Sequence, residues 1–465
     1  MQEADFKSLL VNQQRFFSTG ATLSVDFRIT QLKKLKTLLQ THEAEIAEAL
    51  KKDLNKSHME AVTSEIMLVI EEMNYIIKHL KCWSKPQKVK TPVPFSLLGQ
   101  SMIYHEPYGS VLIIGPWNYP FLLMMSPLIG AMSAGNCVVI KPSDIASHTE
   151  KLLVKLLQTF TTDYIAVVTG GRDVVEKLLQ EKFAYIFFTG GTQVGKIIMT
   201  QAAQHLTPVT LELGGKSPCI IDETAKLDYA ARRIMWAKTL NAGQVCIAPD
   251  YVYVHESCKQ AFIKACITAI KQFYGEDPSK SASYGRIINK NHFLRLMALL
   301  EKNNIIYGGE NNLNDLYISP TLIENISWES PIMQEEIFGP LLPVMTFKNS
   351  DDILPLIKAN AKPLALYLFT HNKQQEEKIV KQLSFGGGCI NDCLLHIANY
   401  HLPFGGVGLS GMGAYHGKYS FETFSHQKGI YKKTRLLDFN LEYPPYHSNK
   451  LRWLRNLLKI GNFFG

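Results

Sequence analysis

The chain reads PYGSVLIIGPWNYPFLLMMSPLIGAMSAGNCVVIK over residues 107–141, and residues 107–140 contain no Asp, Glu, Lys or Arg. Proline, glycine and asparagine divide this apolar run into a strand at residues 111–114, a loop, an apolar helix and a strand at residues 138–141. Short apolar runs of this kind are typical of a parallel sheet covered on both faces. The run exceeds the length of a bilayer span, so a membrane hairpin is the alternative. The internal breaks favour a buried βαβ unit.

The same alternation of apolar segments continues further along the chain. Strands are predicted at residues 164–168 and 185–188, and helices at residues 174–180 and 194–205. We therefore predict an α/β fold whose first domain is a doubly wound, mainly parallel sheet.

The segment before this sheet has a different pattern. Apolar side chains in residues 29–46 recur at helical spacing between charged ones, so the chain up to about residue 80 is expected to form amphipathic helices that pack on the sheet. Residues 85–98 contain three prolines and are the clearest linker-like segment.

Composition and charge exclude several classes of protein. The 465 residues, 46% of them hydrophobic, can bury a sizeable core and form two or three domains. The net charge of +8 comes from scattered Lys and Arg, which argues against a nucleic-acid partner. The eight cysteines lack metal-ligand or extracellular disulfide spacing, so we expect reduced thiols and no metal site. No export signal opens the N-terminus, and we expect a cytoplasmic protein.

A carboxylate and a thiol carry the most informative chemistry. Glu212 lies in LELGGK at residues 211–216, and Cys246 ends GQVC at residues 243–246. A thiolate that attacks a carbonyl and a base that activates water are the minimum for making and hydrolysing a thioester. Each residue also has an ordinary alternative, as a small buried hydrophobe or as a capping or ion-paired carboxylate.

A glycine-rich turn, TGGTQVGK, occupies residues 189–196 between a predicted strand and a predicted helix. Such a turn can bring backbone amides and a helix N-terminus to a phosphate. Its spacing matches neither GxGxxG nor the P-loop, and a tight turn would explain the glycines equally well.

Taken in order, the motifs resemble one family. They are GPWNYP at 115–120, KPS at 141–143, the glycine-rich turn, ELGGK at 212–216, GQVC at 243–246, EEIFGP at 335–340 and PFGG at 403–406. Over about residues 5–435 the chain resembles the aldehyde dehydrogenase superfamily. TPVT at 207–210 and the extended HLPFGGVG at 401–408 resemble its class 3 branch, which includes fatty and aromatic aldehyde dehydrogenases.

The resemblance implies a mechanism for three residues. Cys246 would be the nucleophile that attacks the aldehyde. The Asn118 side chain and the Cys246 backbone N–H would form an oxyanion hole, although Asn118 could also serve as a turn former. After hydride loss to a nicotinamide, Glu212 would activate the water that hydrolyses the thioester.

It also implies how NAD or NADP would bind. Lys141 would contact the adenosine ribose, Glu336 the nicotinamide ribose, and Phe338 the nicotinamide ring. The glycine-rich turn would hold the pyrophosphate with residues Gly190, Gly191, Thr192 and Gly195. Glu335 would simply be solvated.

Two positions depart from the family's usual pattern. Gly191 stands where the family often has Ser, so backbone N–H would have to serve the pyrophosphate. Asp144 stands where it often has Glu, and a shorter carboxylate repels a 2′-phosphate less. We therefore expect the chain to use both NAD and NADP.

The family's architecture implies the domain organisation and the partner. The implied parts are an NAD(P)-binding domain at 1–84 and 110–211, a catalytic domain at 212–400, a bridging β element at 85–109 and 401–435, and a tail at 436–465. A two-stranded ribbon is only marginally stable alone, so the bridging element implies a homodimer.

The substrate is less constrained than the reaction. Tyr119 and Trp236 are candidates to line an apolar tunnel, or they are core aromatics. Medium or long aliphatic aldehydes, or aromatic aldehydes, are the expected substrates. Two alternatives remain, namely a dehydrogenase that passes the acyl group to coenzyme A and a catalytically silent structural or membrane-surface protein.

The tail, from Lys450 on, reads as a basic amphipathic helix over residues 450–460. It is too short to span a bilayer, so a membrane form would lie in the interface, with Trp453, Phe463 and Phe464 buried there. Docking on its own subunit or near the substrate mouth is the alternative.

Overall fold

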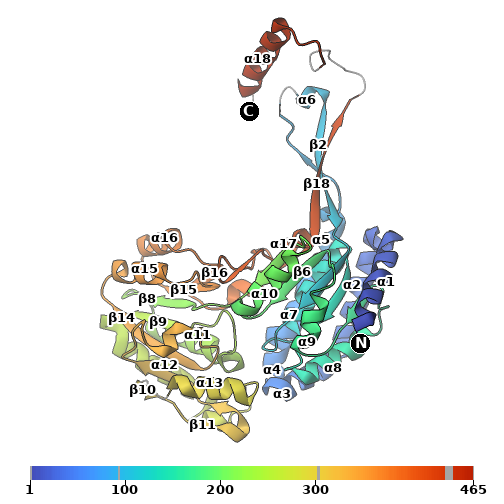
Figure 1. Ribbon diagram of the computed structural model, residues 1–465. Helices are drawn as coiled ribbons and strands as arrows, with labels where there is room; N and C mark the ends of the chain where they lie inside the picture. The colour runs from blue at the N-terminus through green and yellow to red at the C-terminus, as the bar shows by residue number, and fades with distance from the viewer. Residues whose placement is uncertain (1–2, 93–94, 301–303, 435–442, 464–465) are drawn as a thin grey trace.

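The computed structural model describes residues 3–92, 95–300, 304–434 and 443–463. Two mainly parallel sheets with their helices lie side by side, and an antiparallel ribbon projects away from them (Figure 1). The α/β class predicted from the sequence is confirmed.

The first sheet has six strands. They are β17 (Gly411–Met412), β7 (Val209–Glu212), β6 (Tyr185–Thr189), β3 (Ser110–Ile114), β4 (Cys137–Lys141) and β5 (Ile165–Val167), in that order across the sheet. Only β17 is antiparallel to its neighbour. The chain runs outward from β3 to β5 and then crosses to the other side of β3 with β6. The order therefore reverses between β3 and β6, and ligands bind at the carboxyl ends of strands at such a switch point.

Helix α7 (Leu122–Ala134) explains the uncharged run. Every one of its residues is buried, because it packs between the sheet and other helices, among them α2 and α5. The predicted βαβ unit is thus β3–α7–β4. No helix among the described residues is both long and apolar enough to cross a bilayer.

The remaining helices of this part are mostly amphipathic, with their apolar faces inward. They are α1 (Glu3–Ser18), α2 (Val25–Thr41), α3 (Glu43–Leu54), α4 (His58–Ala61), a π-helical turn η2 (Val62–Ile66), α5 (Met67–Trp83), α8 (Ser147–Leu157), α9 (Arg172–Leu178) and α10 (Thr192–Ala203).

The second sheet has seven strands. They are β10 (Asn304–Tyr307), β13 (Thr321–Glu324), β14 (Leu341–Phe347), β9 (Tyr251–His255), β8 (Pro218–Ile221), β15 (Ala365–Phe369) and β16 (Gly387–Ile390), in that order. All but β10 run parallel. The associated elements are α11 (Leu227–Thr239), α12 (Lys259–Tyr274), α13 (Lys290–Leu300), α14 (Pro331–Gln334), α15 (Ser350–Ala359), α16 (Lys373–Gln382), and the short pair β11 (Asn311–Asn312) and β12 (Tyr317–Ile318).

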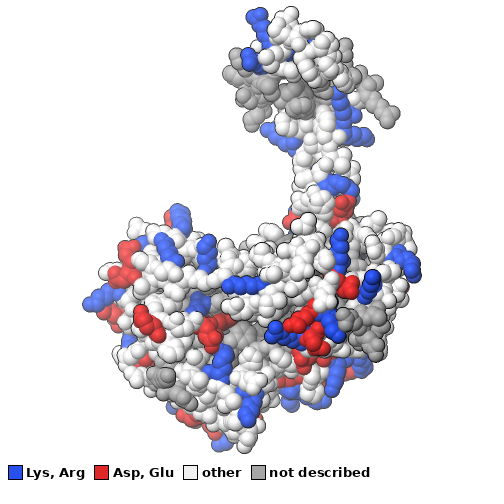
Figure 2. Space-filling model, in the orientation of Figure 1, with Lys and Arg blue, Asp and Glu red and all other residues white. Residues whose placement is uncertain are grey.

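The projecting ribbon consists of β1 (Gln87–Val89), β2 (Gly99–Pro107) and β18 (Ser425–Lys433). Strands β2 and β18 pair along their full length, from Pro107 opposite Ser425 to Gly99 opposite Lys433. Figure 2 shows Lys and Arg along the ribbon and at its outer end, with acidic residues near its base.

The ribbon differs from the predicted bridging element in two respects. The linker-like segment at 85–98 contains β1 and α6 (Phe95–Leu98). Within residues 401–434, the described part of the predicted element 401–435, only β18 joins the ribbon, because β17 pairs with β7 and α17 (Lys418–Thr423) packs on α7. Helix α18 (Ser448–Phe463) stands at the outer end of the ribbon, apart from both parallel sheets (Figure 1).

Candidate active site

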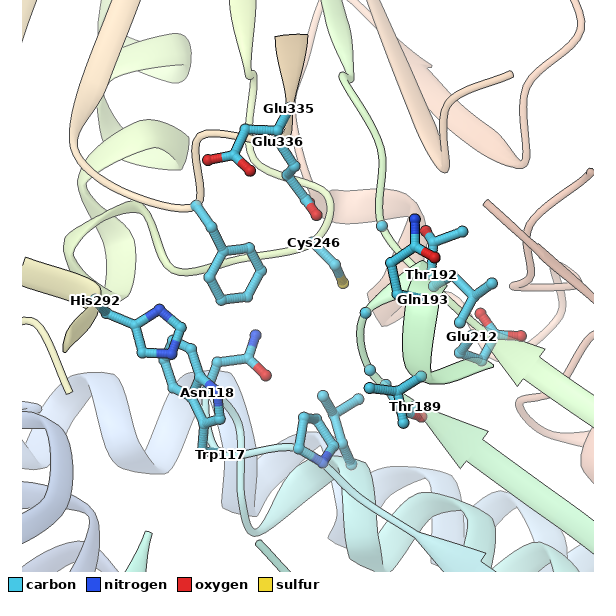
Figure 3. A pocket seen from close by; sticks show the side chains of 18 of the residues that line it. Trp117, Asn118, Thr189, Thr192, Gln193, Glu212, Cys246, His292, Glu335 and Glu336 are labelled. Carbon is cyan, nitrogen blue, oxygen red and sulfur yellow. The ribbon is translucent and has the colours of Figure 1, made fainter. Parts of the chain in front are cut away.

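A cavity of about 460 Å³ opens where the carboxyl ends of β3 and β6 face the second sheet (Figure 3). It is lined by Pro116, Trp117, Asn118, Leu123, Thr189, Gly190, Gly191, Thr192, Gln193, Val194, Glu212, Leu213, Gly214, Cys246, His292, Arg295, Glu335, Glu336 and Phe338. The topological switch point and five of the seven sequence motifs therefore coincide in space, whereas the KPS and PFGG motifs do not line the cavity.

Cys246 follows a strained turn. Asn241, Ala242 and Gly243 have φ of 50°, 51° and 77°, so three successive residues are left-handed. A Cβ on Gly243 would lie 2.2 Å from the Gly339 carbonyl oxygen, so only glycine fits there. The sulfur points into the cavity (Figure 3). Burial raises the pKa of the Cys246 thiol, and nearby carboxyl groups raise it further.

Glu212 ends β7 and reaches the same cavity. Its side chain is buried, and its two carboxyl oxygens have no hydrogen-bond partner among the described residues. Burial therefore holds the pKa of Glu212 well above the ordinary value for a glutamate. A buried carboxylate with unused lone pairs is a strong proton acceptor, which is what the activation of water requires.

Asn118 lies in the loop after β3. Its side-chain Nδ2 donates one hydrogen bond to the Gln244 carbonyl at 3.0 Å. An amide nitrogen carries two hydrogens, so the second remains for an oxygen bound in the cavity. The preceding Trp117 packs edge-on against Phe338, with 5.3 Å between the ring centroids. It also packs at a tilt against His292, with 4.6 Å between the ring centroids.

The glycine-rich turn leads into α10. No side chain caps the N-terminus of this helix, and a Cβ on Gly191 would meet no atom within 4 Å. Thr189 Oγ1 is buried without a partner among the described residues. Amides at a helix start, open space and an unsatisfied hydroxyl fit a phosphate. Gly195 has a different setting, because its missing Cβ makes room for Leu213.

Glu336 and Phe338 lie in a loop that contacts Gly214 and accepts hydrogen bonds from Arg295. Gly214 admits the Glu336 carboxyl, since a Cβ there would lie 2.1 Å from Oε2. Arg295 donates to the Glu336 and Ile337 carbonyl oxygens at 3.3 and 2.5 Å. Burial raises the pKa of Glu336 to about 8.

The same Arg295 binds Glu335 Oε1 at 2.9 Å, so Glu335 is ion-paired rather than simply solvated.

Four predicted residues lie outside the cavity lining, namely Gly195, described above, and Lys141, Tyr119 and Trp236. Lys141 ends β4 and is buried, with its Nζ donating to the Pro142 carbonyl. Tyr119 is buried, with its hydroxyl unpartnered among the described residues. Trp236 lies beneath Arg233, whose Cζ is 4.4 Å from the ring centroid.

Other groups here have no sequence signal. His292 and Arg295 reach the cavity from α13, which carries no motif. Within the described ranges no three His, Cys, Asp or Glu side chains form a metal-binding group, and all eight cysteines are free thiols.

Comparison with known sequences identifies related proteins. Residues 1–430 match the aldehyde dehydrogenase family. A 4,4'-diaponeurosporen-aldehyde dehydrogenase of Staphylococcus aureus is 45% identical over 96% of this chain and 98% of its own length. The dimeric NADP-preferring aldehyde dehydrogenase of Canis lupus familiaris is 44% identical over 92% and 95%. Aldehyde dehydrogenase family 3 member B1 of Bos taurus is 44% identical over 97% and 96%.

Among solved structures, the substrate-bound state of Staphylococcus aureus AldH superposes with a TM-score of 0.95. The two sequences are 44% identical, and the match covers 97% of this chain and 99% of that one.

The raised pKa of Glu336 predicts that the free energy of unfolding decreases as the pH rises. Its folded-state pKa of about 8 exceeds the ordinary glutamate value of 4.5, so as the pH rises between these values the unfolded state loses its proton first and stability falls. Glu336→Gln removes this loss of stability. We expect its melting temperature to exceed that of the wild type at about pH 8 and to match it at about pH 5. Glu335→Gln, at a half-exposed neighbour, is the control, and a pH-independent difference for Glu336→Gln would contradict the argument.

Proposed function

The chain belongs to the aldehyde dehydrogenase family and to its class 3 branch, and from this premise we propose that it oxidises aldehydes to acids through a thioester on Cys246. The observation that carries the proposal is the convergence of Cys246, Glu212 and Asn118 on one cavity at the switch point of the first sheet.

The first step is attack on the aldehyde. The Cys246 thiolate adds to the carbonyl carbon and forms a thiohemiacetal. The free Nδ2–H of Asn118 and the Cys246 backbone N–H would stabilise the negative oxygen, and such donors are each worth about 10²–10³ in turnover. The hydride would pass to a bound nicotinamide, and the acyl group would remain on Cys246 as a thioester.

The second step is hydrolysis. Glu212 takes a proton from water, the hydroxide attacks the thioester carbonyl, and Cys246 leaves as a thiolate. The raised pKa of Glu212 supports this role, because a carboxylate that loses its hydration on burial binds a proton more strongly. A retained Glu212 favours water over coenzyme A as acceptor, and the complete set of three residues argues against a silent protein.

Two substitutions separate the two steps. Cys246→Ser should abolish NADH formation from an aldehyde panel. Glu212→Gln should form about one equivalent of NADH per site and then slow by about 10²–10⁴. Cys389→Ser, a thiol outside the cavity lining, is the matched control. Steady turnover by Cys246→Ser would overturn the mechanism, as would a need for added thiol by the wild type.

For substrate class we propose medium or long aliphatic aldehydes, or aromatic ones. Tyr119 and Trp236 remain the candidates for an apolar wall. The relative named as a 4,4'-diaponeurosporen-aldehyde dehydrogenase supports an aldehyde as the substrate. Arg295, a cation at the cavity, already binds Glu335 and two carbonyl groups, so it offers little to a phosphorylated aldehyde.

For the cofactor we propose both NAD and NADP. The uncapped start of α10 and the open space at Gly191 would hold the pyrophosphate, and Lys141 and Glu336 would hold the two riboses. The NADP-preferring relative supports the use of NADP in this branch. Asp144 is the short carboxylate expected near the 2′ position.

The two cofactors should give kcat/KM values within about a hundredfold of each other. Asp144→Glu should shift the ratio towards NAD, because the longer carboxylate approaches and repels the 2′-phosphate. Steady-state kinetics with each cofactor tests both statements. A wild-type preference above about a hundredfold, or no response to Asp144→Glu, would count against this assignment.

We propose a homodimer assembled through the ribbon. Strand β18 lies at an edge of the three-stranded sheet, and β16 lies at an edge of the second sheet. An edge strand can pair with a strand of a second chain. A projecting ribbon of this kind needs further strands or packing for stability. The relative named as dimeric supports the proposal.

We also propose a cytoplasmic enzyme with a peripheral membrane contact through residues 450–464. Leu451 and Trp453 of α18 are exposed beside Arg452 and Arg455, a combination typical of interfacial helices. The side chains from residue 457 on, including Phe463 and Phe464, lie outside the described residues.

Vesicles that contain anionic lipid should sediment the full chain but not a chain that ends at Asn449, and added salt should weaken the binding. Neutral vesicles and aldehyde turnover by the shortened chain are the controls. Equal sedimentation of the two chains would remove the membrane contact.

A further inference from the structure

Asn241 joins the two loops that carry the proposed nucleophile and the proposed oxyanion donor. Its Nδ2 donates to the Asn118 carbonyl at 2.8 Å and to the Gln244 carbonyl at 3.2 Å. Asn118 Nδ2 also donates to the Gln244 carbonyl, at 3.0 Å. The three residues form a closed set of hydrogen bonds in which the orientation of the Asn118 amide depends on the position of Asn241.

Asn241 itself is held by a buried carboxylate from another part of the chain. Its backbone N–H donates to Glu60 Oε1 at 2.8 Å, and Glu60 is 8% exposed. This bond forms where the left-handed turn before Cys246 begins, at the first residue with positive φ. Left-handed non-glycine residues persist only where surrounding contacts fix them. Glu60 supplies such a contact.

A second buried charge fixes the other loop. Lys56 Nζ donates to the Asn118 carbonyl at 3.2 Å and pairs with Glu65, and both side chains are fully buried. Glu65 Oε2 in turn accepts from the Phe121 and Leu122 N–H groups at 3.0 Å, at the start of α7. The π-helical turn η2, which carries Glu65, follows α4, which carries Glu60.

The charged side chains of Lys56, Glu60 and Glu65 lie away from the surface of the cavity. None of Lys56, Glu60 and Glu65 lines the cavity. Buried ion pairs are often no more stable than apolar residues of similar size, because each charge loses its hydration. What the three residues do provide is a set of directed bonds to the loops of Asn118 and Asn241.

We propose that Glu60, Asn241 and Lys56 are positioning residues that set the Asn118 amide against Cys246 for attack on the aldehyde. The inference rests on the proposed function, since it assigns the network to the oxyanion step. The network stabilises the anionic oxygen through Asn118, which is needed at the attack on the aldehyde and again when hydroxide attacks the thioester. It should leave cofactor binding unchanged.

A pair of substitutions at Glu60 isolates the hydrogen bond. Glu60→Gln keeps an oxygen that accepts from Asn241, whereas Glu60→Met keeps the length and removes the acceptor. With enzyme in excess over aldehyde and with saturating NAD, stopped-flow NADH formation measures attack and hydride loss in one turnover. We expect Glu60→Met to lower this rate constant by about ten- to a hundredfold and Glu60→Gln to stay within about threefold of the wild type.

Asn241→Gly is an independent test, because glycine suits the positive φ and removes both side-chain donors. It should slow the same step, while NADH binding, followed by fluorescence titration, stays unchanged. Asp222→Ala is the matched control, since it removes a buried carboxylate that binds Thr224 and Thr370 away from the cavity. It should lower the melting temperature and leave the rate constant intact.

When the enzyme is in saturating excess, the limiting aldehyde fixes the amplitude, and the rate constant of a single turnover does not depend on the fraction of folded enzyme. A Glu60→Met variant with a lowered melting temperature but the wild-type rate constant would show that Glu60 only stabilises the fold, and would overturn the inference. A Glu60→Gln variant as slow as Glu60→Met would overturn it too. Failure of the proposed function would look different. The wild-type chain would then form no NADH in a single turnover, or the Cys246→Ser chain would still form it.

Discussion

The hydrogen bond from Asn118 Nδ2 to the Gln244 carbonyl is the contact on which the rest of the site depends. Asn118 follows β3 of the first sheet, and Gln244 precedes β9 of the second. Neither sheet contains a complete site, because Cys246 belongs to one and the glycine-rich turn to the other. The oxyanion role that we propose for Asn118 requires its amide to be held to within a fraction of an ångström. One short bond between the two parts meets that demand only if both loops are rigid, and the strained turn at Asn241 is rigid because several groups fix it.

Burial gives this cavity its chemistry at a cost in stability. The pKa values of Cys246, Glu212 and Glu336 are all raised, chiefly by loss of hydration. Loss of hydration disfavours the charged form of each group. A cationic nicotinamide in the same space would favour the charged forms instead. Binding of the cofactor is therefore expected to lower these pKa values.

The sequence predicts the parts of the site that local motifs define and misses those that long-range contacts define. The uncharged run at 107–140 predicts the βαβ unit because burial on both faces leaves no place for charge. The motifs also bring Glu212, Cys246 and Asn118 forward as candidates. Glu60 belongs to no motif, and it contacts Asn241 across 181 positions of the chain. Arg295 comes from a helix with ordinary amphipathic spacing. Nothing local distinguishes such residues from surface charges until the fold has buried them.

Several glycines that read as chemical motifs are in fact marks of close packing. A Cβ on Gly214 would strike the Glu336 carboxyl, and one on Gly243 would strike the Gly339 carbonyl. Both clashes involve the loop at 336–339, which therefore lies against Gly214 on one side and Gly243 on the other. Gly195 likewise yields space to Leu213. The motifs around Glu212 and Cys246 thus mark where the loop at 336–339 must approach. A larger residue at Gly214 or Gly243 would move this loop away from Cys246 without a change in any of the proposed reacting groups.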